Sequence, residues 1–215
     1  LISSKLTLEG PVKKDTSSFI ISGRRTYFDV LAKPFLDTTA FAGSSYHFYD
    51  LTTKANYQIS AKDKIYLSGY FGRDVFNFNS ENWGFRMNMP WGNATASLRW
   101  NHLFNSNLFM NTSLIFSDYK YELNMSQDLD SVPSSQTSMF SGIRDWNVKN
   151  DFSYYPNPKH KIKFGSNYVY HRFNPTSFSG NYDDLELEQI INYYAHEYGL
   201  YINDEYEFNK RLLIN

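Results

Sequence analysis

The histidines of this chain, the first residues to consider for metal or acid–base chemistry, are spread singly along it. None is paired at the i, i+4 spacing or within the HExxH sequence that brings two imidazoles to one zinc ion. No GxSxG nucleophile turn, P-loop or GxGxxG motif occurs, and cysteine is absent. We therefore expect no enzyme activity, no catalytic residue, no cofactor and no metal site. The histidines are His47, His102, His160, His171 and His196.

Acidic residues gather in two polar stretches, where they could bind a cation. Asp128 and Asp130 are separated by one leucine, but the segment lacks the glycine and the distal glutamate of a calcium-binding loop. We therefore interpret these carboxylates as solvated loop charge. They are Asp128, Asp130, Asp183, Asp184, Glu186 and Glu188.

Elsewhere, charged and polar residues alternate with apolar ones, as in a β-strand with one polar and one apolar face. Within 94–104, for example, Leu98 and Trp100 share one face, and Arg99 lies on the other. The pattern breaks at 19–21, where three consecutive residues are apolar, and a β-bulge or a local change of face would explain this. The same alternation recurs at 49–59, 65–71, 108–117, 146–154, 162–171 and 194–205.

Short polar turns recur along the chain at intervals of roughly 45 to 52 residues, and long stretches without strand periodicity lie between them. The predicted strands run to roughly 12 to 16 residues, which is enough for a tilted membrane crossing of ~9–11. Short turns on one side and long loops on the other are typical of a transmembrane β-barrel. The turns are 11–16, 60–63, 105–107, 156–160 and 209–211, and the long loops are 32–45, 77–89, 124–142 and 174–188.

The composition fits a barrel wall. Aromatic residues make up 19% of the chain, with 18 Tyr and 18 Phe, and tyrosine suits the boundary of a membrane. No run approaches the ~20 apolar residues of a membrane helix, so a membrane protein of this sequence must be a barrel. The balance of 21 basic against 22 acidic residues argues against a nucleic-acid partner and against a broad anionic-lipid surface.

Two further expectations follow from a barrel. Aromatic residues near the strand ends should form girdles at the membrane interfaces. They are Tyr46, Phe48, Tyr49, Phe76, Phe78, Trp91, Phe104, Tyr119, Tyr121, Tyr154 and Tyr155. Charged residues on the polar face of the strands should face the lumen. Our candidates are Arg24, Lys54, Arg99, Lys149, Lys163 and Glu197.

Four segments resemble the barrel of TonB-dependent outer-membrane receptors, particularly the Bacteroidota type. They are LTLEGPVKKDTSSFIISGRRTY (6–27), FYDLTTKANYQISAKDKIYLSGYFGRD (48–74), WGNATASLRWNHLFNSNLFMNTSLIFSDYKYE (91–122) and YAHEYGLYINDEYEFNKRL (194–212). The resemblance implies a 22-stranded barrel closed by a plug domain, in which TonB drives the uptake of a scarce nutrient.

By this resemblance, residues 1–215 are a partial barrel of about nine to ten long meander strands. Both ends look cut, and the plug domain and the remaining strands lie outside the chain. The lumen-facing candidates then also become candidates for plug contact, Arg24 among them. The partners implied are outer-membrane lipid, TonB and the plug, and an extracellular small-molecule, glycan or peptide ligand.

The leading hypothesis is thus a non-enzymatic segment of an energy-coupled nutrient receptor in the outer membrane of a Gram-negative bacterium. A passive porin-like or adhesin barrel is the second hypothesis. A soluble carbohydrate-binding β-sandwich is the third. The sequence does not identify the substrate, because one architecture serves many ligands.

Overall fold

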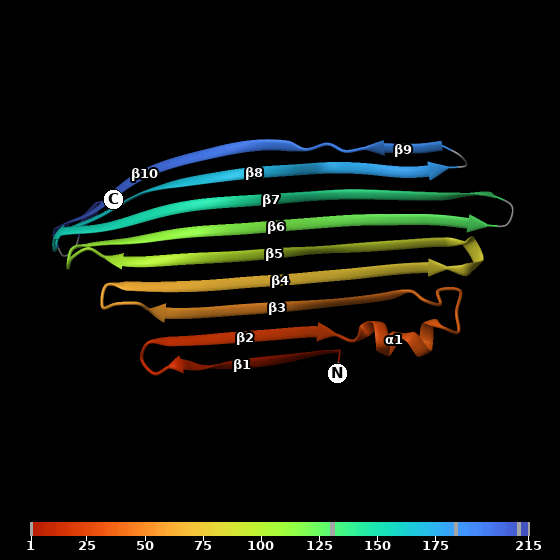
Figure 1. Cartoon of the computed structure of the whole chain (residues 1–215), viewed down its shortest axis with the longest axis horizontal. Coiled ribbons are helices and arrows are strands. Elements are labelled where there is room, and N and C mark those ends of the chain that lie inside the picture. Colours follow the sequence, from red (N-terminus) through yellow and green to blue (C-terminus); the bar gives the residue numbers. More distant parts are fainter. Residues whose placement is uncertain (1, 130–131, 183–184, 210–211, 215) are drawn as a thin grey trace.

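The computed structural model describes residues 2–129, 132–182, 185–209 and 212–214, which form one antiparallel sheet of eleven strands (Figure 1). Long strands pair with their neighbours in sequence, so the sheet is a meander. The short strand β9 and the long strand β10 pair with successive parts of β8, and β11 begins the next strand. This arrangement confirms the predicted all-β meander of about nine strands and the start of a tenth.

The strands are long, and one short helix interrupts them. Helix α1 (Phe28–Leu36) and the turn η1 (Glu81–Trp83) follow β2 and β4 respectively. The strands are β1 (Ser3–Lys13), β2 (Ser17–Thr26), β3 (Ser45–Gln58), β4 (Asp63–Ser80), β5 (Phe85–Leu103), β6 (Leu108–Leu129), β7 (Val132–Asn157), β8 (His160–Tyr182), β9 (Leu185–Gln189), β10 (Tyr193–Asn209) and β11 (Leu212–Ile214).

The short turns lie where the sequence predicts them. The connections β1–β2, β3–β4, β5–β6 and β7–β8 lie together at one end of the strands (Figure 1). We call this end of the sheet the turn edge. Asp15 has a positive φ of 58° in the first of them, a conformation that aspartate tolerates better than most residues. Of the fifth predicted turn, 209–211, residues 210 and 211 lie outside the described residues.

Three of the four predicted long loops are instead mostly strand. β6 has 22 residues and β7 has 26, so they run through most of 124–142, and β4, β5, β8 and β9 likewise occupy most of 77–89 and 174–188. The prediction was wrong because Ser, Asn and Asp are common in loops but here occupy one face of strands whose other face is apolar. The remaining loop, 32–45, contains part of α1 and an irregular segment, as expected for a long connection.

The predicted bulge at 19–21 is also absent from β2. Its residues pair in continuous register with β3, and the one shift against β1 lies between Pro11 and Lys13, where proline cannot donate a ladder hydrogen bond. Ile20 therefore keeps its place in the alternation, and it pairs with Lys54.

The register defines two faces, since directly paired residues point to the same side of a sheet. Trp100 pairs with Ile65 and Thr112, and this side is called the Trp100 face. Arg99 pairs with Tyr66 and Ser113, and this side is called the Arg99 face.

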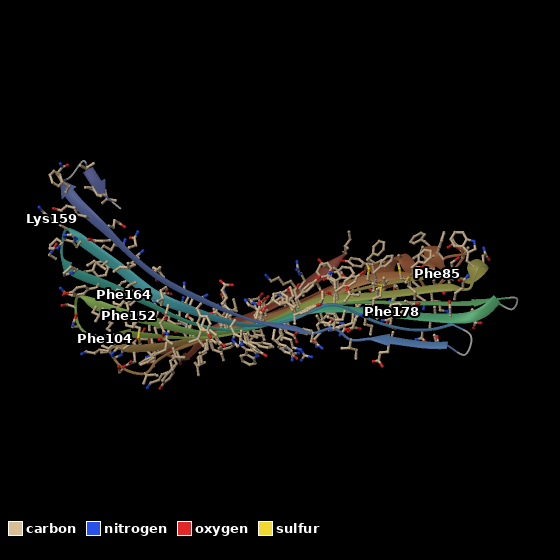
Figure 2. All side chains as sticks on the ribbon, turned by 90° about the horizontal axis from the view of Figure 1, so that it is seen from above. Phe85, Phe104, Phe152, Lys159, Phe164 and Phe178 are labelled. Atoms are coloured by element: carbon tan, nitrogen blue, oxygen red, sulfur yellow. The ribbon has the colours of Figure 1, made fainter. Side chains whose placement is uncertain are left out.

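The two faces exchange polarity about halfway along the strands. On β6, the Trp100 face is mainly apolar from Leu108 to Phe116 and then carries Asp118, Lys120 and Glu122. On the same strand the Arg99 face becomes apolar where the other face becomes charged, at Tyr119, Tyr121, Leu123 and Met125. Figure 2 shows the result: Phe104, Phe152 and Phe164 project to one side near the turn edge, and Phe85 projects to the other side at the far end.

This exchange follows one line across the sheet, which we call the polarity boundary. It passes between Phe116 and Asp118 on β6 and between Trp146 and Arg144 on β7, and these four residues lie in adjacent rows of the register. It also lies between Phe71 and Arg73 on β4 and between Tyr170 and Arg172 on β8. The boundary divides the sheet into a turn-side half and a far half.

The sheet buries almost no apolar side chain of its own. Val169 is the one buried hydrophobic residue among those that the structure describes, and the accessible surface of the chain is 14793 Å². A compact protein of 25.2 kDa would expose about 10,300 Å². Both faces of the sheet must therefore meet another medium or another domain.

Gly92 is needed for the close pairing of β4 with β5. A Cβ atom at this position would overlap the carbonyl oxygen of Gly72 and crowd the Cα of Arg73. We expect Gly92→Ala to lower the free energy of unfolding by about 1–3 kcal/mol, the usual cost of overpacking, measured by urea titration of the refolded protein. Gly23→Ala is the matched control on the same face, because its nearest neighbour would lie 3.9 Å away. Equal stability of the two variants would contradict this account.

Candidate functional site

The six predicted lumen-facing residues all lie on the Arg99 face. They come from β2, β3, β5, β7, β8 and β10, so they line this face rather than converge on one point. Paired residues form rows that run across the strands. Lys54 on β3 and Glu197 on β10 belong to one such row, and Arg99 and Lys149 share the next row on the same face. The residues are Arg24, Lys54, Arg99, Lys149, Lys163 and Glu197.

Several of these charges already have partners within the chain. Arg24 pairs with Asp50 at 2.7 Å, and its guanidinium also lies 4.9 Å from the ring centre of Phe48. Lys149 lies 3.2 Å from Asp151. The guanidinium of Arg99 stacks over Tyr66 at 4.7 Å. These pairs hold the side chains along the sheet surface, where they make this face polar without forming a catalytic arrangement.

The Arg99 face is hollowed in the turn-side half. A concavity of about 910 Å³ lies over β1 to β6. Lys54 and Arg99 line it together with Tyr66, and the paired hydroxyls of Ser68 and Ser97 lie 2.7 Å apart on its floor. This half of the face is thus both concave and polar.

In the far half, the same face carries a continuous apolar surface that the sequence analysis did not identify. We call it the aromatic–methionine patch. The sequence signal for this surface is the alternation on β6, where every second residue, Tyr119, Tyr121, Leu123 and Met125, is apolar or aromatic. The patch consists of Tyr46, Phe48, Phe76, Phe78, Phe85, Met87, Met89, Trp91, Tyr121, Leu123, Met125, Met139 and Phe178.

Ring contacts hold the patch together. Tyr46 stacks on Trp91 with ring centroids 6.3 Å apart and an interplanar angle of 22°. The ring centroids of Phe78 and Phe85 lie 6.1 Å apart. Phe41, from the segment after α1, also contacts Phe78, with ring centroids 5.7 Å apart. Offset rings and thioethers offer a polarisable surface that favours flat or apolar ligand groups.

The polar atoms within the patch are satisfied locally. The Tyr46 hydroxyl donates to Asp74 at 2.8 Å, and the Tyr121 hydroxyl donates to the Met89 sulfur at 3.3 Å. Partial burial raises the pKa of Tyr46, and the hydrogen bond to Asp74 and the charge of that carboxylate raise it further. The phenol therefore stays protonated at neutral pH and remains a donor to the carboxylate.

The patch corrects the expected aromatic girdle. Tyr49, Phe104 and Tyr154 do lie on the Trp100 face. The aromatic residues of the far half lie on the opposite face, because the apolar parity changes at the polarity boundary while the register continues. They are Tyr46, Phe48, Phe76, Phe78, Trp91, Tyr119 and Tyr121, and by alternation Tyr155 at the turn edge also opposes Tyr154.

The histidines and loop carboxylates do not assemble into a site within the described part of the chain. There, no three His, Asp or Glu side chains are placed to hold a metal ion. His102 instead lies 2.7 Å from Asp63, and His196 lies 2.9 Å from the Tyr168 hydroxyl. Asp128 and Glu188 are exposed. Asp130, Asp183 and Asp184 lie outside the described residues, as does the side chain of Glu186.

Comparison with known proteins supports the fold. No family model and no curated protein matches the chain. Among solved structures, it is similar to the crystal structure of FyuA, the ferric yersiniabactin uptake receptor of Yersinia pestis, with a TM-score of 0.67 and 12% sequence identity. The likeness covers 97% of this chain and 35% of the receptor, so the chain spans about a third of that receptor's length.

This likeness shows that the sheet is an antiparallel β-barrel segment, as the sequence predicts. At this identity it says nothing about the ligand. Among the described residues, no helix is long and apolar enough to cross a membrane.

The Tyr46–Asp74 hydrogen bond should stabilise the far half of the sheet. We expect Tyr46→Phe to lower the free energy of unfolding by about 1 kcal/mol, because it removes a donor from a carboxylate and keeps the stacked ring. Tyr121→Phe is the matched control, since it removes only a weak bond to sulfur. Urea unfolding followed by tryptophan fluorescence measures both, and a larger loss in Tyr121→Phe would refute the assignment.

Proposed function

We propose that this chain is part of the wall of a TonB-dependent outer-membrane receptor that takes up an extracellular nutrient. The observation that carries this proposal is the exchange of polarity between the two faces along one line of the sheet. A wall that crosses a membrane and then continues into water needs this pattern, because its outer surface changes medium while its inner surface encloses the transport path.

The turn-side half of the Trp100 face has the properties of a lipid-facing surface. On β6 the mainly apolar stretch of this face, from Leu108 to Phe116, covers about nine residues. This is close to the ~9–11 residues that a tilted strand needs to cross the hydrocarbon core. Leu98, Leu114 and Trp146 are exposed on it by 41%, 48% and 56%. Contact with lipid would remove this apolar surface from water.

The Arg99 face then faces the lumen, in keeping with its concave shape and its charges. The candidates for plug contact are Arg24, Lys54, Arg99, Lys149, Lys163 and Glu197. Lys54, which lines the concavity, is a better candidate than Arg24, whose guanidinium is already paired with Asp50.

The far half is proposed to stand outside the cell above the outer membrane. Its outer face is polar, as contact with water requires, and the aromatic–methionine patch lines the inside of the vestibule. This patch is the proposed surface for capture of a small molecule, glycan or peptide with flat or apolar groups. Passage inward would then use the plug and TonB, which the family resemblance implies.

The alternatives receive less support. A β-sandwich needs a second sheet against the apolar face, and the described residues form one sheet. A passive porin-like barrel or an adhesin shares the lipid-facing band, but it has no need of an apolar vestibule above the membrane.

The two faces can be tested by cysteine labelling, because the chain contains no cysteine. In outer membranes, we expect a bimane label on Leu98→Cys to be quenched by brominated lipid and a label on Ser97→Cys to be protected. Beyond the polarity boundary, Lys120→Cys should react with a membrane-impermeant maleimide on intact cells. Equal quenching at both neighbouring positions, 97 and 98, would contradict the assignment of faces.

Energy coupling has a separate test. Cells with and without the protein are grown in media limited in turn for iron, cobalamin, a glycan or a peptide source. We expect an advantage in one medium that disappears when tonB is deleted, because uptake through a plugged barrel needs TonB. An advantage that persists without TonB indicates a passive barrel. An advantage in none of the media would count against the uptake of these nutrient classes.

A further inference from the structure

A narrow groove lies on the Trp100 face just beyond the polarity boundary. Arg73, Gly92 and Lys120 belong to one register row on three adjacent strands, so two cationic side chains flank a position without a side chain. The groove has a volume of about 130 Å³, and Phe71, Pro90, Ala94, Asp118 and Glu122 also line it. Two inter-strand spacings of ~4.8 Å separate the backbones that carry the two cations.

The charges at the groove are nearly balanced, with a small positive excess. Asp118 accepts from Arg144 at 2.9 Å and lies 3.6 Å from Lys120, so one carboxylate is shared by two cations. The Nε of Arg144 is buried without a hydrogen-bond partner, and Arg73 has no side-chain partner within the described residues. Arg73, Lys120 and Arg144 thus stand against two carboxylates, Asp118 and Glu122, an excess of one positive charge.

A row of small residues, which we call the acyl row, continues from the groove toward the turn edge. On β5, the Trp100 face carries Gly92, Ala94 and Ala96 in succession, all small. Phe71 and Phe116 on the neighbouring strands stand higher on the same face. This row runs into the apolar band of the turn-side half.

The opposite edge of the apolar band has a different charge. There the Trp100 face carries Asp63, which accepts from Trp100 at 3.0 Å and lies 2.7 Å from His102, and Asp204, which lies 2.7 Å from His160. Asp63 and Asp204 are thus paired with histidines, whereas Arg73 and Lys120 lie at the polarity boundary.

We propose that this groove binds an anionic lipid of the outer leaflet, with a headgroup phosphate between Arg73 and Lys120 and one acyl chain along Ala94 and Ala96. Cations at the level of the headgroups attract phosphate, and three cations against two carboxylates leave an excess of one positive charge at the site. The overall charge of the chain is near neutral, so this local excess is hidden in the composition. The inference needs the Trp100 face to meet lipid but does not depend on the uptake of any nutrient.

The test measures lipid retention by the full protein in nonionic detergent with native mass spectrometry. The probe is a bisphosphorylated, acylated glucosamine disaccharide, and its dephosphorylated form is the comparison. We expect Lys120→Gln to weaken binding about tenfold and Arg73→Gln with Lys120→Gln to abolish it, since each change removes a charge-assisted contact. Lys14→Gln with Lys159→Gln, which removes two cations at the turn edge, should leave binding unchanged.

A second variant tests the acyl row without altering charge. Ala94→Leu fills the space over this row and should weaken binding of the acylated probe, while heat-modifiable migration confirms that the barrel is folded. Equal binding by wild type and Lys120→Gln, or equal binding of the dephosphorylated probe, would overturn the proposal. Displacement by inorganic phosphate would show a free-anion site instead of a lipid site.

Discussion

The hydrogen-bonded ladder of a sheet only one layer thick is the interaction on which the rest of this structure depends. Because the described residues bury one hydrophobic side chain, the sheet cannot rely on a core of its own. Backbone amides of the inner strands find their partners in the neighbouring strands, and each face is left for a different environment. A soluble domain solves this problem with a second layer, whereas a barrel wall solves it with lipid on one side and an enclosed lumen on the other.

The same ladder explains why the exchange of polarity requires a change in the sequence pattern of each strand. In continuous register a residue cannot change faces, so the only way to alter the outer surface is to alter which parity is apolar. On β6 this change occurs between Phe116 and Asp118, and β4, β7 and β8 change close to the same row. Agreement among strands far apart in sequence makes the boundary a property of the sheet, not an accident of one strand.

Much of the fold was predictable from the sequence, because turns and period-two alternation are local signals. The turn-edge connections, the strand order and the shared face of Arg24, Lys54, Arg99, Lys149, Lys163 and Glu197 all follow from them. The extended strands of the far half were missed because Asn, Ser and Asp are common both in loops and on a water-facing strand. The aromatic–methionine patch does not follow from a fixed apolar face, because the apolar face changes along each strand. The groove beside Gly92 requires three strands to be aligned, which no local pattern provides.

The long strands of the far half have a consequence for recognition and for evolutionary change. The proposed capture surface is carried on paired strands and is ordered before a ligand arrives, so binding would lose less conformational entropy than closure of flexible loops requires. In such a vestibule, specificity would change through substitution of single side chains at the fixed backbone positions of the paired strands. A vestibule built from loops can also change by insertion and deletion. The rigidity of the paired strands would favour ligands whose own shape is rigid.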